Sequence, residues 1–242
     1  MHMLTYALVL ILSYILGSIP FGLLIVKFST GKDIRFVASG RTGGTNAMRA
    51  AGPLAFAGTA VFDVLKGAGA VWLASALVPG TIWLKVFAPM MSILGHNYSI
   101  FLTERDEHGR LRLRGGAGGA PTVGGAAGIW LPSLLIVLPV AGILLFIVGY
   151  ASLTTMGIAV TVTIVFAVRA WLLGQPWQFV VYGLIAEAML IWSLRPNIKR
   201  LIEGKERVVG LRARHKKPTS KPPVERNTGP GKPYSSSSSS SS

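Results

Sequence analysis

Cysteine is absent from this 242-residue chain, which excludes disulfide bonds and thiolate chemistry. The 4 histidines are scattered, and without cysteine none has the spacing of a metal site, so neither a metal nor a cofactor is expected. Charge is scarce too: only 14% of residues are charged, against about 25% in soluble domains. With 51% hydrophobic residues and a mean hydropathy of +0.54, this balance indicates a membrane protein.

Acidic residues are the rarest charges, with 9 Asp and Glu against 24 Lys and Arg, so the net charge is +15. Residues 195–242 hold 12 of those basic residues and 3 of the acids. Such an excess can indicate nucleic-acid binding. Beside many apolar spans it favours cytoplasmic loops near anionic lipid, so we expect membrane lipids and no nucleic acid as partners.

Long apolar runs predict an all-α, polytopic membrane fold. No basic segment precedes the first run, so we interpret it as a retained span and not as a cleaved signal. A Pro-containing stretch inside that run predicts a kink. The expected spans are residues 4–26, 53–77, 81–102, 121–131, 134–150, 154–173 and 177–194. The fourth is short and glycine-rich, and it is plausible only if other helices cover it.

The distribution of basic residues predicts the topology. Lys and Arg gather between the first two spans, in the polar insert 103–114 and after residue 194. The positive-inside rule places these segments in the cytoplasm. Parity then requires seven spans, with the N-terminus outside and the C-terminus cytoplasmic, as expected for a multi-pass protein of the inner (plasma) membrane. Residues 1–206 form the membrane domain, and residues 207–242, rich in Lys, Arg, Pro and Ser, form a disordered cytoplasmic tail.

The loop between the first two spans has the strongest site chemistry. It combines small residues, hydroxyls, an amide and guanidinium groups, which suit the binding of an anion such as phosphate. The candidates are Ser39, Arg41, Thr45, Asn46 and Arg49. For Arg41 the alternative is a contact with lipid headgroups.

Charged and polar residues within or beside later spans are further candidates. Asp63 and Lys66 lie three apart on one helical face, either as a structural pair or as part of a site. His96 is a base, a phosphate donor or a packed polar residue, and Asn97 follows it. The insert 103–114 alternates after a polar turn, which predicts a small hairpin.

Two more segments complete the candidate cytoplasmic site. The glycine run after Arg114, with Gly115, Gly116 and Gly118, offers either a second phosphate cradle or close helix packing. The segment from Arg195 to Glu206, which contains Asn197, predicts an amphipathic interfacial helix. Together with the first loop, these segments suggest an enzyme of phospholipid synthesis.

Five motifs, in this order, carry a resemblance to a known family. They read G-S-I-P-F-G from residue 17, S-G-R-T-G-G-T-N-A-M-R from 39, D-V-L-K-G from 63, G-H-N-Y-S from 95 and N-I-K-R-L-I-E-G-K-E from 197. The chain resembles the bacterial acyl-phosphate-dependent glycerol-3-phosphate acyltransferases. The resemblance implies seven membrane helices and transfer of a fatty acyl group from acyl phosphate to the sn-1 hydroxyl of glycerol 3-phosphate. The product is lysophosphatidic acid.

The resemblance also implies residue roles and partners. Ser39, Arg49, His96 and Asn197 would be catalytic, and Asp63, Lys66 and Glu206 would support them. The residues that would bind substrate phosphate are Thr45, Asn46, Asn97, Gly115, Gly116 and Gly118. The enzyme that makes acyl phosphate is a candidate partner. Two alternatives stay open: a non-catalytic relative that binds acyl phosphate or lipid, and a small anion transporter.

The chain departs from the family pattern at three positions. Arg41 replaces an asparagine, Ala117 replaces a lysine and Leu194 replaces a histidine. The lost side chains are two charge-assisted donors, each contributing roughly 1.5–3 kcal/mol. We hypothesise that Arg41, with Arg114, takes over as the phosphate clamp.

Overall fold

The computed structural model describes residues 2–105 and 107–215 of the chain. Its α-helices are α1 (His2–Ser18), α2 (Phe21–Thr30), α3 (Gly44–Ala51), α4 (Pro53–Leu77), α5 (Ile82–Asn97), α6 (Gly119–Ile129), α7 (Leu134–Ile143), α8 (Ala151–Leu173), α9 (Gln178–Ile202) and α10 (Gly210–His215). Two strands and three short helical turns complete the described part: β1 (Ser99–Arg105), β2 (Leu111–Arg114), η1 (Ile34–Phe36), η2 (Leu131–Ser133) and η3 (Leu144–Val148).

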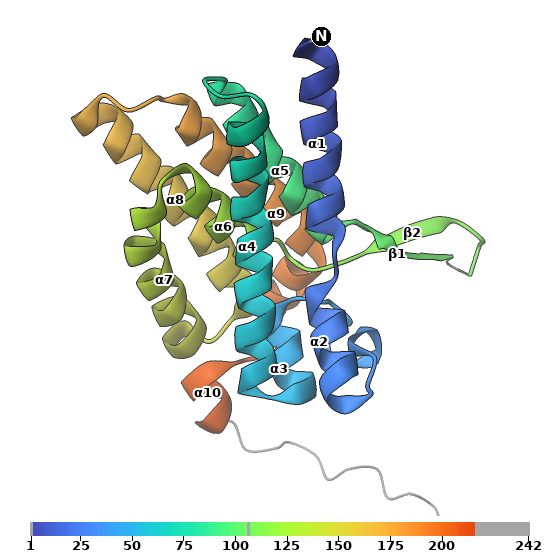
Figure 1. The fold of residues 1–242 in the computed structure, drawn as a ribbon. Helices are drawn as coiled ribbons and strands as arrows, with labels where there is room; N and C mark the ends of the chain where they lie inside the picture. The colour runs from blue at the N-terminus through green and yellow to red at the C-terminus, as the bar shows by residue number, and fades with distance from the viewer. Residues whose placement is uncertain (1, 106, 216–242) are drawn as a thin grey trace, which may run out of the picture.

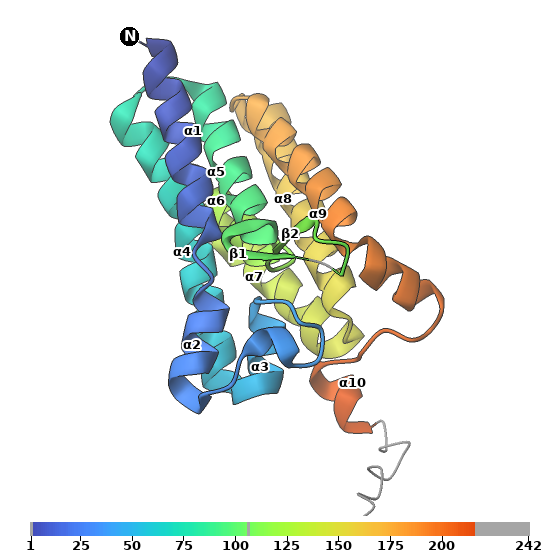
Figure 2. The same ribbon diagram turned by 90° about the vertical axis from the view of Figure 1, so that its right-hand side faces the viewer.

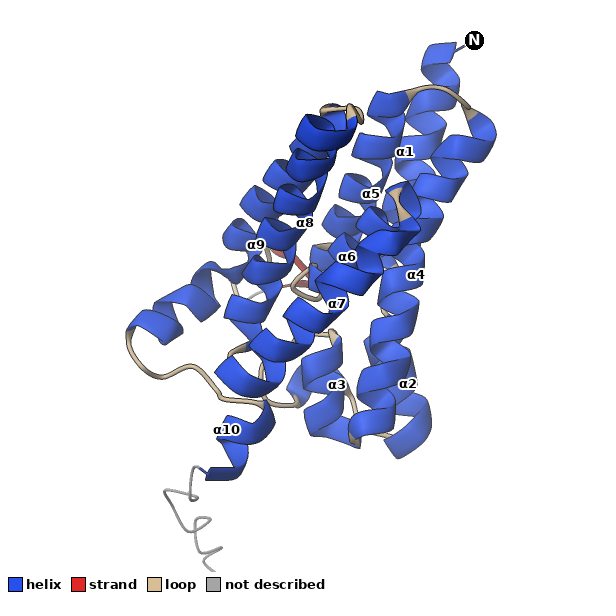
Figure 3. Ribbon diagram, turned by 90° about the vertical axis from the view of Figure 1, so that its left-hand side faces the viewer, coloured by secondary structure: helices blue, strands red, loops and turns tan. Residues whose placement is uncertain are grey.

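The long helices form one bundle in which the short α6 is central (Figure 1). Figures 2 and 3 show α1, α4 and α5 on one side of the bundle and α8 and α9 on the other. The largest core cluster joins α5, α6, α8 and α9 through Ile93, Val123, Phe166 and Leu190. Burial of such side chains stabilises the contacts between helices, while apolar side chains on the outer faces remain exposed, as lipid requires.

Glycines bring the central helices into close contact. In α4, a Cβ on Gly67 would overlap the carbonyl of Pro121 in α6; in α6, a Cβ on Gly124 would overlap the carbonyl of Val64 in α4. Small residues at such crossings let two backbones approach. The glycine-rich segment therefore forms a helix whose residues are mostly buried by its neighbours, which was the condition set for a span there.

The expected break in the first span separates α1 from α2 at Pro20. Proline has no backbone N–H and cannot continue the hydrogen-bond ladder of α1. The carbonyl of Ile19 instead accepts a hydrogen bond from Nζ of Lys66 in α4 at 3.2 Å. The break thus provides an acceptor for a charged side chain inside the bundle.

Within the described residues, five helical segments are long and apolar enough to cross a membrane: 3–30, 53–77, 131–148, 151–173 and 178–202. The second agrees with the predicted span 53–77. The other two expected spans correspond to α5 and α6, which have 16 and 11 residues. The seven-span topology and the orientation of the termini stay predictions. The last span is longer than expected, because α9 continues through Pro196 to Ile202.

The described residues are mostly helical, as the all-α prediction requires, and β1 and β2 pair as a small antiparallel hairpin that projects from the bundle (Figure 1). This hairpin confirms the one predicted for the insert. Residues 207–215, which belong to the predicted disordered tail, are folded in the structure. Val208 bridges to Tyr150, the backbone N–H of Val209 donates to Gly149, and α10 follows. From residue 216 onward the predicted tail lies outside the described residues.

Candidate functional site

The loop that precedes α4 is held by one buried amide. Nδ2 of Asn46 donates to the carbonyls of Ile34, Val37 and Arg41 at 3.2, 3.0 and 2.9 Å. Its Oδ1 accepts from the backbone N–H of Ser39 at 3.4 Å. The side chain was predicted to bind phosphate; it lines the cavity described below, and in this structure its donors are used to shape the loop. The second half of the predicted loop is in fact α3, which begins at Gly44.

Arg41 points into the bundle and not toward lipid headgroups. Its Nη1 donates to the carbonyl of Gly116 at 2.8 Å, and Nη2 donates to the carbonyl of Ser193 at 2.6 Å. Burial, followed by the nearby Arg200, lowers the pKa of Arg41. A guanidinium nevertheless stays protonated at neutral pH. No ion pair of Arg41 is found within the described residues. Its positive charge is therefore available to an anion.

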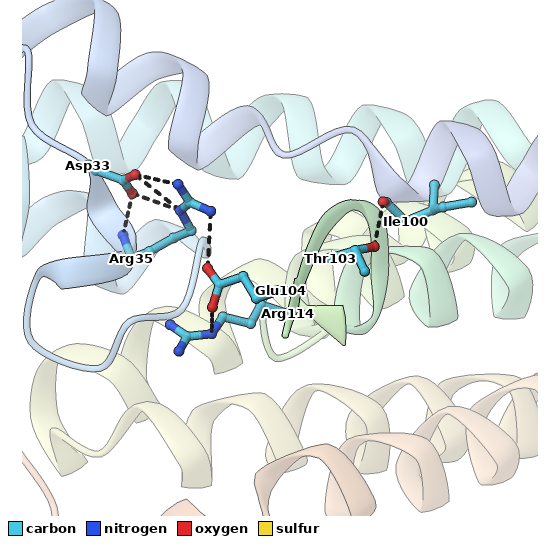
Figure 4. Close-up of polar contacts among 6 residues, drawn as sticks. All are labelled: Asp33, Arg35, Ile100, Thr103, Glu104 and Arg114. Atoms are coloured by element: carbon cyan, nitrogen blue, oxygen red, sulfur yellow. Dashed lines mark hydrogen bonds and ion pairs between the residues drawn. The ribbon is translucent and has the colours of Figure 1, made fainter. Parts of the chain in front are cut away.

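Arg114 lies outside this arrangement. Its Nε forms an ion pair with Glu104 at 2.8 Å, and Glu104 also pairs with Arg35 at 3.0 Å. Arg35 in turn binds Asp33 at 2.7 Å, so the network joins the hairpin to the loop (Figure 4). Hydrogen bonds from Arg35 lower the pKa of Asp33. Arg114 is not on the cavity wall, so the hypothesis that it supports Arg41 as a phosphate clamp is corrected.

Asp63, Lys66 and His96 form a buried polar triad. Nζ of Lys66 lies 2.8 Å from Oδ1 of Asp63 and 2.7 Å from Nδ1 of His96. Nδ1 of His96 also lies 3.5 Å from Oδ1 of Asp63, so it accepts from Lys66 when the ring proton is on Nε2 and donates to Asp63 when the proton is on Nδ1. Asp63 and His96 line the cavity described below, whereas Lys66 lies behind them. The predicted pair thus supports the histidine.

The glycine run packs beneath His96. A Cβ on Gly116 would overlap the imidazole ring, and a Cβ on Gly115 would overlap the backbone carbonyl of His96. Of the two alternatives for the glycine run, close packing therefore applies to Gly115 and Gly116. Gly118 differs: it lines the cavity with a φ of 96°. Asn97 is buried against Gly118, off the cavity wall, and its amide has no hydrogen-bond partner among the described residues.

The C-terminal part of α9 and the segment after it close the site. Nδ2 of Asn197 donates to Glu206 at 3.3 Å, and the hydroxyl of Ser152 donates to the other carboxylate oxygen. Oδ1 of Asn197 is buried without a partner among the described residues, and the residue lines the cavity. Glu206 thus holds Asn197 in position and leaves its amide oxygen for a ligand.

These elements surround a cavity of about 380 Å³. Its polar part is rich in guanidinium groups, and its other part is apolar. The polar residues on its wall include Ser39, Arg41, Thr45, Arg49, Asp63, His96, Asn197, Arg200, Glu206 and Arg207. The apolar residues include Phe56, Ala60, Val64, Val123, Leu138, Ala141, Leu145, Phe146 and Ile158. The arrangement suits a ligand with an anionic head and an apolar chain.

Two helix N-termini add to the positive potential. Gly43 precedes α3 and Gly118 precedes α6, and both line the cavity. Neither helix has a side-chain cap or an acidic residue in its first turn. The first N–H groups of a helix have no partner within the helix and carry the positive end of its dipole. Both termini can therefore donate to an anionic group.

The chain is similar to solved structures of PlsY (YgiH), described as an integral membrane glycerol 3-phosphate acyltransferase. Its glycerol 3-phosphate form is 29% identical, with a TM-score of 0.71, and the match covers 85% of this chain and 96% of that chain. Its lysophosphatidic acid form is 28% identical, with a TM-score of 0.68. The model of the family described as glycerol-3-phosphate acyltransferase matches residues 7–204. This chain belongs to that family.

Curated relatives agree with the family. Glycerol-3-phosphate acyltransferase of Rubrobacter xylanophilus is 35% identical over 210 residues, covering 85% of this chain and 96% of that protein. The enzyme of the same name from Thermus thermophilus is 37% identical over 205 residues, covering 84% and 95%. The chain is thus a membrane acyltransferase of phospholipid synthesis.

Sequence reasoning missed part of the family site in this chain. Arg200 and Arg207 line the cavity, but in the sequence they were only two more basic residues near the membrane. Ser193 was missed because its role depends on Arg41, 152 positions away. The apolar wall from α7 was also missed. Its signal was present, because Leu138, Ala141, Gly142 and Leu145 follow one helical face.

Proposed function

We propose that the chain transfers a fatty acyl group from acyl phosphate to the sn-1 hydroxyl of glycerol 3-phosphate, giving lysophosphatidic acid. The observation that carries the proposal is the two-part cavity, which joins a guanidinium-rich head region to an apolar region. Relatives named as glycerol-3-phosphate acyltransferases support the acceptor. A solved relative in a lysophosphatidic acid form supports the product.

The proposed reaction does not require a nucleophilic side chain of the protein. The hydroxyl oxygen attacks the acyl carbonyl carbon, the bond between that carbon and the phosphate oxygen breaks, and inorganic phosphate leaves. Acyl phosphate is already activated, so positioning and charge neutralisation supply most of the catalysis. In the proposed site Lys66 donates to Nδ1 of His96, which places the ring proton on Nε2, and the histidine acts as a donor. The leaving phosphate takes the hydroxyl proton.

Arg41 is central to the proposed site. It donates to Gly116 and Ser193, which directly precede Ala117 and Leu194, the positions where the resemblance implies a lysine and a histidine. The guanidinium therefore lies between the two places that lost a donor. We propose that it clamps substrate phosphate there, alongside the N-terminus of α6.

The other roles follow the resemblance and the geometry. Ser39, Thr45 and Arg49 face the cavity and are proposed to bind substrate, while Asn197 offers its free amide oxygen to a glycerol hydroxyl. Burial and the neighbouring Arg207 lower the pKa of Arg49, which keeps its charge at neutral pH. The proposed membrane is the inner membrane, with the site on its cytoplasmic face and the N-terminus outside.

One experiment separates acyl transfer from its alternatives. Purified protein is supplied with palmitoyl phosphate and radiolabelled glycerol 3-phosphate, and lysophosphatidic acid is measured. Product formation supports the proposal. No product with any acyl chain length, together with retained binding of acyl phosphate, identifies a non-catalytic relative. Uptake of labelled glycerol 3-phosphate into proteoliposomes without acylation identifies a transporter.

A further inference from the structure

The apolar part of the cavity follows one face of α7 and its continuation η3. Leu138, Ala141, Gly142, Leu145 and Phe146 line it at spacings of i, i+3, i+4, i+7 and i+8. At 1.5 Å per residue this face is about 12 Å long. Its first and last members, Leu138 and Phe146, are 50% and 44% exposed, so the wall continues to the outer surface of the bundle.

The opposite wall comes from α4, where Phe56, Ala60 and Val64 recur at every fourth residue and line the same cavity. Small residues, Ala60 on one wall and Ala141 and Gly142 on the other, lie between the larger ones. The cavity is therefore a groove lined by bulky residues, and the smallest residue, Gly142, lies in the middle of the α7 face.

Gly142 differs from most helical glycines of this chain. A Cβ on Gly67 or Gly124 would overlap the backbone of a neighbouring helix, so those glycines are needed for packing. A Cβ on Gly142 would meet nothing within 4 Å. Its φ is not positive, so the backbone does not require glycine there either. Glycine in a helix interior costs roughly 0.5–1 kcal/mol relative to alanine, and here no protein contact offsets that cost.

We infer that Gly142 is a specificity-determining residue that keeps the groove open for the distal part of a long acyl chain. This inference rests on the proposed acyl transfer and adds to it the position that sets chain length. The phosphate lies among the guanidinium groups, and the chain runs along α7 past Gly142 toward Leu138. A larger side chain at residue 142 occupies the groove midway and leaves room for short chains only.

The test compares Gly142→Phe and Gly142→Leu with the parent on butyryl, lauroyl and palmitoyl phosphate. We expect kcat/KM for palmitoyl phosphate to fall roughly ten- to hundredfold, because the larger side chain occupies the part of the groove that several methylene groups of the acyl chain would fill. The value for butyryl phosphate should change less than about threefold, because so short a chain does not reach residue 142. Gly142→Ala is the small control. Leu135→Phe is the matched bulky control, because Leu135 is 79% exposed on α7 and off the cavity wall. An unchanged chain-length profile in Gly142→Phe overturns the inference.

A binding measurement separates this outcome from failure of acyl transfer itself. Non-hydrolysable acyl phosphonates of the same chain lengths are tested for thermal stabilisation of each variant. Gly142→Phe should lose stabilisation by the long phosphonate and keep it for the short one. If the parent makes no product but shows this pattern, acyl transfer fails and the groove assignment stands. Equal stabilisation of parent and Gly142→Phe by the long phosphonate overturns the assignment.

Discussion

At the scale of single residues, the hydrogen-bond partners of a polar side chain in the first loop decide whether it shapes the loop or can bind an anion. Asn46 and Arg41 are five positions apart and both looked like anion ligands. Asn46 uses its amide on three backbone carbonyls, whereas Arg41 brings an unpaired charge to the cavity. A buried guanidinium without a carboxylate partner is costly unless an anion binds, which makes Arg41 the more informative position.

Replacing Arg41 tests its proposed role. Arg41→Ala should lower kcat/KM for acyl transfer by roughly ten- to hundredfold, the value of one lost charge-assisted contact. Arg41→Lys should fall between, because an ammonium cannot reproduce both guanidinium contacts. Arg195→Ala is the matched control, because Arg195 is stacked on Trp192 away from the cavity. Unimpaired transfer by Arg41→Ala contradicts the clamp.

At the scale of elements, the glycines between the hairpin and α6 serve two purposes, close packing and anion binding. Gly115 and Gly116 let the chain pass under His96, and Gly118 turns it into α6 with a positive φ. The helix therefore begins at the cavity, where its first N–H groups can donate to an anion. The same run serves packing and anion binding at different positions.

Gly116→Ala tests the packing role. The added methyl group meets the His96 ring, so the ring must move away from Lys66. We expect a loss of roughly 1–3 kcal/mol of stability, typical of overpacking, and lower activity. Thermal unfolding and the acyl-transfer assay measure both. Gly58→Ala should be tolerated, because its Cβ meets only the flexible end of Ile25 at 3.3 Å. Equal behaviour of the two variants contradicts this account.

The network that joins the hairpin to the loop predicts a pH dependence. Arg35 holds the pKa of Asp33 below its ordinary value of 3.8. A group whose pKa is lowered by folding stabilises the fold above its unfolded pKa, and this contribution disappears as pH falls through the folded value. Hydrogen exchange in residues 33–41 should therefore accelerate as pH drops below 3.8, beyond the intrinsic effect of pH. Asp33→Asn should show no such step, and a step of equal size in that variant contradicts the assignment.

At the scale of the whole molecule, the absence of cysteine makes the predicted topology directly measurable. Single cysteines at Lys32 and Glu203 should react with a membrane-impermeant maleimide only after the inner membrane is opened. Cysteines at Pro79 and Gln175 should react in intact spheroplasts. All four positions are exposed, and the latter two lie in turns at the same end of the bundle as the N-terminus (Figure 1). Labelling of both pairs from the same side contradicts seven spans.

The sequence by itself determined the helical segments, the break at Pro20, the hairpin and the three polar segments that carry the site. These features follow from hydropathy, from the missing N–H of proline and from turn chemistry, which act over a few residues. The order of the motifs was enough to identify the family, because it does not depend on how the helices pack.

Only the tertiary structure decided which side chains face the cavity. The side chain of Arg41 points into the bundle and donates to Ser193, whereas Arg114 pairs with Glu104 away from the cavity. Residues 207–215 fold back and contact η3. The proposed role of Gly142 follows from the absence of any atom within 4 Å of a Cβ at that position. The physical reason is common to all of these. Hydrogen-bond partners and free volume come from residues far apart in the chain, and only packing brings them together.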